Sequence, residues 1–82
     1  MAEKSMIERV ARELCRSDGH PENIRYEGKP MWASYAATAR KVIAAMRKPT
    51  EAMVLAGLRS ADAGLPNEYT AMIDAAASEV IA

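Results

Sequence analysis

The chain has 82 residues, and its eleven Lys and Arg balance its eleven Asp and Glu, so it carries no net charge. Such a chain has no overall field that attracts nucleic acid or membranes, and no apolar run reaches the roughly 18 residues of a membrane-spanning helix. Half of the residues are nominally hydrophobic but 17 of them are alanine, which predicts one small domain over residues 1–82 with a thin core.

The charges are unevenly distributed along the chain. Residues 1–48 hold ten Lys and Arg against six Asp and Glu, whereas residues 49–82 hold one against five. A thin core and two oppositely charged halves favour self-association, so we expect a homodimer. The single cysteine excludes an intramolecular disulfide, and no basic segment followed by an apolar run opens the sequence. We therefore expect a cytoplasmic protein without a signal peptide.

The first predicted helix covers residues 5–17. Ser5 and Glu8 have the spacing of a capping box, and apolar residues follow at helical spacing. Glu8–Arg12 and Arg9–Glu13 are expected to pair across one turn. Residues 17–30, which hold two prolines and two glycines, are expected to form an irregular loop.

The second predicted helix covers residues 30–48 and begins at Pro30. The apolar residues Trp32, Ala36, Ala39, Ile43 and Met46 follow one another at steps of four and three, as on a heptad seam. Pro49 ends this helix.

The third and fourth helices are expected over residues 50–63, capped by Thr50, and 66–81, opened by Pro66. Their segments Ala52–Gly57 and Ala71–Ala76 nearly repeat each other, each placing a methionine beside small residues. A very short linker predicts that these helices pack as an antiparallel hairpin with the two segments facing each other. The predicted fold is all-α, a compact four-helix domain.

No set of residues suggests catalysis. Cys15 lies on the apolar side of the first helix, which is typical of a buried, inert thiol, and His20 lacks the further ligands of a metal site. A Cys15–His20 nucleophilic pair would lack a third, orienting group. We therefore predict no enzyme activity, no cofactor and no metal.

Two charged surfaces are candidates for binding. Tyr26 and Tyr35, near the loop, and the basic cluster Arg40, Lys41, Arg47 and Lys48 on the second helix form the first. The two basic pairs are one heptad apart, so we expect them on the same side of that helix. The alternative is an acidic face on the fourth helix, made of Glu68, Asp74 and Glu79.

The segments Tyr26–Tyr35, Met46–Met53 and Ile7–Arg12 resemble stretches of small, uncharacterised phage and prophage proteins of proteobacteria. The resemblance covers about half of the chain. It implies an accessory protein of a mobile element, and small proteins of this kind often bind and block a host complex. Inhibitors of host defence, anti-CRISPR proteins among them, are one such class.

These observations predict a non-catalytic protein-interaction module that binds, and plausibly inhibits, a host protein complex such as a defence system. The alternative is a small nucleic-acid-binding regulator that uses the basic face of the second helix. The sequence does not choose between the basic and the acidic surface.

Overall fold

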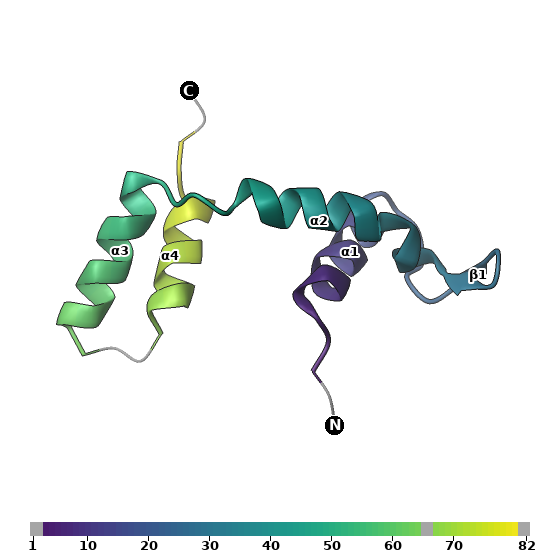
Figure 1. Cartoon of the computed structure of the whole chain (residues 1–82), viewed down its shortest axis with the longest axis horizontal. Coiled ribbons are helices and arrows are strands. Elements are labelled where there is room, and N and C mark those ends of the chain that lie inside the picture. The colour runs from purple at the N-terminus through teal and green to yellow at the C-terminus, as the bar shows by residue number, and fades with distance from the viewer. Residues whose placement is uncertain (1–2, 65–66, 81–82) are drawn as a thin grey trace. The chain divides into compact units, whose positions relative to one another are not determined.

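The computed structural model describes residues 3–64 and 67–80, which are mostly helical with one small two-stranded sheet. The chain divides into two compact units, Met1–Arg47 and Lys48–Ala82, hereafter the N-terminal and C-terminal units. The N-terminal unit holds α1, α2 and the small sheet, and the C-terminal unit holds α3 and α4 (Figure 1). An all-α fold is thus broadly confirmed, whereas the expectation of one domain over residues 1–82 stays a prediction.

Helix α1, Met6–Ser17, begins as the sequence predicts. The Ser5 hydroxyl accepts a hydrogen bond from the Glu8 amide at 3.0 Å, but the Glu8 carboxylate does not return to Ser5. It accepts a charged hydrogen bond from Arg12 instead, which is the stronger interaction. Asp18 is the C-cap of α1, and Gly19 follows it with a φ of 82°, a conformation that favours glycine.

The segment expected to be an irregular loop contains a small hairpin. Strand β1, Arg25–Tyr26, pairs antiparallel with β2, Lys29–Pro30. The two residues between them, Glu27 and Gly28, both have positive φ, as the tight turn of a two-residue hairpin requires. The side chains of Ile24 and Tyr26, at this hairpin, are more than half exposed and do not pack into the core.

The helix expected over residues 30–48 is both divided and shorter. Residues Met31–Tyr35 form a 3-10 helix, η1, and only Ala36–Ala45 form the α-helix α2. The amides of Met31 and Trp32 donate to the carbonyls of Ile24 and Glu22, so the loop holds the start of this segment. At the other end, Pro49 disfavours a helical conformation at the residue before it.

The core of the N-terminal unit lies where α1 packs against α2 and η1. Ala11 and Cys15 of α1 and Ala39 of α2 are fully buried there. Ala39 is the central residue of the predicted heptad seam, while Met46 at the end of that seam is 47% exposed because it lies beyond the helix.

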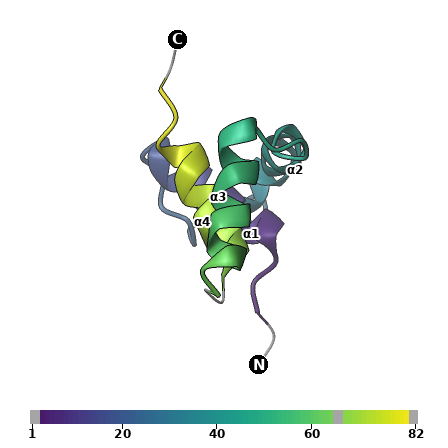
Figure 2. The ribbon, with the colours of Figure 1, turned by 90° about the vertical axis from the view of Figure 1, so that its left-hand side faces the viewer.

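In the C-terminal unit, α3, Glu51–Asp62, and α4, Glu68–Ala77, lie side by side (Figures 1 and 2). Thr50 caps α3, and the Asn67 side chain caps α4 by accepting from the Thr70 amide at 3.0 Å. Helix α4 is therefore shorter than the expected 66–81. The proposed start at Pro66 and the end at residue 81 lie outside the described residues.

Close packing of the two near-repeats is confirmed at one point. A Cβ added to Gly57 would lie 3.0 Å from both Cγ and Sδ of Met72, so a larger residue at this position would require the Met72 side chain to move. Met53 and Ser60, one turn to either side, are also buried. The Thr50 hydroxyl donates to the Glu79 carboxylate at 3.0 Å, which joins the start of α3 to the residues after α4.

Candidate functional site

Arg12 is the centre of the polar contacts in the N-terminal unit. Its Nε donates to the Glu8 carboxylate at 2.8 Å, and its Nη1 donates to Glu22 at 3.2 Å and to Asn23 Oδ1 at 3.0 Å. The guanidinium also lies 5.2 Å from the centroid of the Trp32 ring, close enough for a cation–π interaction. Arg12 therefore fastens α1 both to the loop that follows it and to η1.

This cluster has a structural role. The hydrogen bond to Glu8 is the main cause of a raised pKa for Arg12, and it outweighs the opposing effect of desolvation. A guanidinium that keeps its proton cannot act as an acid or a base. Arg16 adds a further link, because its Nε lies 3.1 Å from the second carboxylate oxygen of Glu22.

Cys15 and His20 do not form a nucleophile and a base. The Cys15 thiol is buried and donates to the backbone carbonyl of His20 at 3.6 Å, while His20 itself is exposed. Burial raises the pKa of the Cys15 thiol, and the charges of Glu22 and Asp18 add to that effect. The reactive thiolate is disfavoured, as expected for an inert cysteine.

Tyr35, a predicted binding residue, is already engaged within its own unit. Its hydroxyl donates to the Asp18 carboxylate at 2.7 Å and so ties η1 to the end of α1. This hydrogen bond, with burial as the second cause, raises the pKa of Tyr35 to about 12. The side chain is half-buried and belongs to the fold more than to a binding surface.

An open groove of about 680 Å³ lies along α1, and the apolar residues among those that line it form what we call its floor. Met6, Val10 and Leu14 follow one another at steps of four, which places them in one row along the helix. Val42 of α2 lines the groove beside them. The row spans about 12 Å at the usual rise per residue, which matches two turns of a partner helix.

The charged residues that line the groove, which we call its rim, are mostly cationic. They are Lys4, Arg9, Arg12, Arg16, Glu13 and Glu22. Both carboxylates are already paired with Arg12 or Arg16. Within residues 3–64 and 67–80, Lys4 and Arg9 have no ion-pair partner, because Glu13 pairs with Arg16 and not with Arg9 as expected. The groove therefore presents two free positive charges beside an apolar floor.

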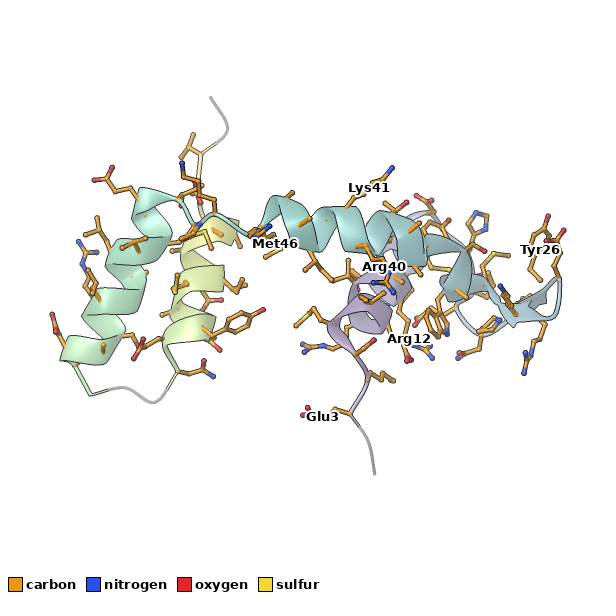
Figure 3. All side chains as sticks on the ribbon, in the orientation of Figure 1. Glu3, Arg12, Tyr26, Arg40, Lys41 and Met46 are labelled. Carbon is orange, nitrogen blue, oxygen red and sulfur yellow. The ribbon has the colours of Figure 1, made fainter. Side chains whose placement is uncertain are left out.

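The predicted basic cluster is not one surface. Arg40 and Lys41 are exposed on α2 and point to different sides of it, while Tyr26 lies out on the hairpin (Figure 3). The prediction that the pair Arg47 and Lys48 lies on the same side of one helix as the pair Arg40 and Lys41 is wrong, because α2 ends at Ala45. Moreover, the boundary between the two units falls between Arg47 and Lys48.

The predicted acidic residues do not share one face either. Glu68 and Asp74 are six residues apart on α4, which turns them about 120° from each other. Glu79 lies beyond the end of α4 and accepts a hydrogen bond from Thr50. All three carboxylates are exposed, but the fold disperses them.

The groove is the feature that sequence reasoning missed. Met6, Val10 and Leu14 belong to the apolar residues at helical spacing in the first predicted helix, a spacing that does not show which of them are buried. Only the packing of α1 shows that Ala11 and Cys15 are the buried members of that set.

Within the described part of the chain, no three His, Cys, Asp or Glu side chains are grouped as a metal site would require. Among the described helices, none has both the length and the apolar character needed to cross a membrane. Comparisons with protein-family models, with curated proteins and with solved structures found no match to this chain. The function is therefore argued from the residues of the groove and its surroundings.

Proposed function

We propose that the chain is a non-catalytic interaction module whose α1 groove binds an acidic, amphipathic segment of a partner protein. The observation that carries this proposal is the apolar floor, Met6, Val10 and Leu14, beside two cations of the rim, Lys4 and Arg9, that have no ion-pair partner within residues 3–64 and 67–80. An amphipathic helix binds such a groove through apolar residues spaced three or four apart. Carboxylates on the flanks of that helix would meet the two cations.

A protein segment suits this groove better than a nucleic acid does. A phosphate backbone offers nothing that would cover the apolar floor of Met6, Val10 and Leu14. The basic surface proposed for nucleic acid on α2 is reduced to Arg40 and Lys41. In line with the phage resemblance, the partner would belong to a host complex such as a defence system, which the bound chain inhibits.

The test is fluorescence anisotropy with a labelled synthetic peptide that carries leucines at helical spacing and glutamates on either side. We expect binding that weakens as salt rises, because the cations contribute through charge. Reversal of both free cations, Lys4→Glu with Arg9→Glu, should weaken binding by at least about tenfold.

The matched control is Lys29→Glu with Lys41→Glu, which makes the same charge change at exposed cations of the same unit that do not line the groove. This control should keep nearly full peptide affinity. Absence of binding at low salt, or an equal loss in the control, would refute the proposal. Salt-sensitive binding of a short DNA duplex that is lost only in the Lys29→Glu, Lys41→Glu variant would favour the alternative function, a nucleic-acid-binding regulator.

For the C-terminal unit, we propose that α3 and α4 form an antiparallel hairpin. The mid-helix contact between Gly57 and Met72, together with the hydrogen bond from Thr50 to Glu79, supports this arrangement. A homodimer, expected from the thin core, is also part of the proposal.

A further inference from the structure

The outer side of α3 is apolar and exposed. Met53, Gly57 and Ser60 are buried and define the side of α3 that faces α4. At about 100° per residue, Leu55 and Leu58 lie within about 50° of the opposite side. These two leucines are 44% and 56% exposed, respectively. The C-terminal unit thus has a second apolar surface that its own two helices leave uncovered.

The charges on this outer side form a symmetric pattern. Glu51, Leu55 and Arg59 are spaced four apart, so they lie in one row with a negative charge about 6 Å before the leucine and a positive charge about 6 Å after it. Within residues 3–64 and 67–80, neither Glu51 nor Arg59 has an ion-pair partner. When a second copy of this row runs in the opposite direction, its positive end lies opposite the negative end of the first.

A second copy of α3, laid antiparallel with its Leu55 against the first Leu55, meets this pattern on both sides. Glu51 of each copy then faces Arg59 of the other, and Leu58 of one copy lies at the same height along the helix axis as the small Ala52 of the other. The same register brings Asp62 toward the segment that holds Lys48. A parallel arrangement would instead place like charges opposite each other, which is destabilising.

We propose that the outer face of α3 pairs with α3 of a second copy, antiparallel about a two-fold axis at Leu55. The occupant is a second copy and not an unrelated protein because the charge row complements itself. A unit of two short helices also gains the most from such pairing, since so small a unit seldom stabilises itself. This interface uses only the C-terminal unit and is therefore independent of the groove proposal.

Disulfide trapping of the full-length chain tests the register directly. In a Cys15→Ala background, Leu55→Cys should form a dimer under mild oxidation, because the two thiols meet at the axis. Leu58→Cys is the matched control, since its two copies would be about 9 Å apart along the helix axis, beyond disulfide reach. Rapid trapping at Leu58 but not at Leu55 would overturn the proposed register.

Charge exchange tests the partner without disturbing the leucines. Sedimentation equilibrium should give a mass near twice the 8.9 kDa of the chain. Glu51→Arg alone, or Arg59→Glu alone, should weaken dimerisation by at least about tenfold, because each change creates two repulsive pairs. The double variant with both changes should restore it, since the row is then complementary again.

Restored dimerisation in the double variant supports the interface even if a single variant is poorly folded. A wild-type chain that stays monomeric at the highest soluble concentration would overturn the proposal, whether another protein or another part of the same chain covers the face. Dimerisation that is equally strong in the wild type and in both single variants would overturn it too.

Discussion

The two units of this chain bury their apolar residues in different ways. The core of the N-terminal unit contains three small, fully buried residues, Ala11, Cys15 and Ala39. Hydrogen bonds from Arg12 link its helix to the following loop. The C-terminal unit has a single seam between two helices and leaves Leu55 and Leu58 on its outer side. The comparison teaches that one unit is held by polar links between its loop and its helix, whereas the other is held mainly by one seam between two helices and leaves large apolar residues exposed.

The largest effect is expected where the C-terminal seam is tightest. Gly57→Val would force a branched side chain into space occupied by Met72, and such overpacking costs about 1–3 kcal/mol of unfolding free energy. Thermal or urea unfolding followed by circular dichroism measures this loss. Ala61→Val, an exposed position on the same helix, should cost under about 1 kcal/mol from helix propensity alone.

The double variant Gly57→Val with Met72→Ala sharpens this prediction. Removing the methionine makes room for valine, so the combined loss should be smaller than the sum of the two single losses. Strictly additive losses would show that Gly57 and Met72 are not in contact.

Replacement of the central arginine should be the most damaging single change on the polar side of the N-terminal unit. Arg12→Lys keeps the charge but cannot reach Glu8, Glu22 and Asn23 together, because lysine lacks the planar fork of the guanidinium. We expect a lower melting temperature. Arg9→Lys, at an exposed arginine of the same helix without an ion pair, is the control and should leave it nearly unchanged.

The Tyr35–Asp18 hydrogen bond predicts a pH dependence at the alkaline end. Because the pKa of Tyr35 is raised to about 12 in the folded chain, against about 10 for a free tyrosine, its contribution to stability is complete below pH 10. That contribution is lost as the pH rises from about 10 through 12. Urea unfolding at a series of pH values should show a loss of stability over this interval that is smaller in Tyr35→Phe.

Asp18→Asn provides the complementary observation. Without the carboxylate that accepts its hydrogen bond, the pKa of Tyr35 should move back toward 10, as followed by tyrosinate absorbance. An unchanged titration in Asp18→Asn would show that the hydrogen bond is not the cause of the shift.

The smallest effect concerns the buried thiol. Because Cys15 is fully buried and burial raises its pKa, its reaction with a disulfide reagent should be much slower in the folded chain than in urea. Its rate reports the local opening of the N-terminal unit. Equal rates in the two conditions would contradict the burial of this residue.

Several features that depend on neighbouring residues were predicted correctly from the sequence, although Glu13 pairs with Arg16 and not with Arg9. Ser5 and Thr50 cap their helices, and Glu8 pairs with Arg12 one turn away. The requirement for a small residue at Gly57 was also visible, because the two near-repeats lie on consecutive helices. In each case the signal and the contact lie within a few residues or within one repeated pattern.

Features that depend on distant contacts, or that lack a clear local signal, were missed. The extension of the Arg12 cluster to Glu22 and Asn23 depends on how the loop returns to α1, which no local spacing reveals. The hairpin at Glu27 and Gly28 lacks the Asn-Gly or Asp-Gly signal that usually marks such turns. The prediction of one basic face on the second helix is wrong because the helix ends at Ala45. Arg47 and Lys48 therefore do not lie on it.

The central claim is that the N-terminal unit binds an acidic partner segment in its α1 groove, and a chemical-shift titration tests it most directly. When the labelled full-length chain is titrated with the Glu/Leu peptide, shifts should concentrate on Lys4–Arg16 of α1 and its start, and on Val42. Resonances of α3 and α4 should stay in place. Shifts confined to Arg40 and Lys41, or no shifts at low salt, would contradict the account.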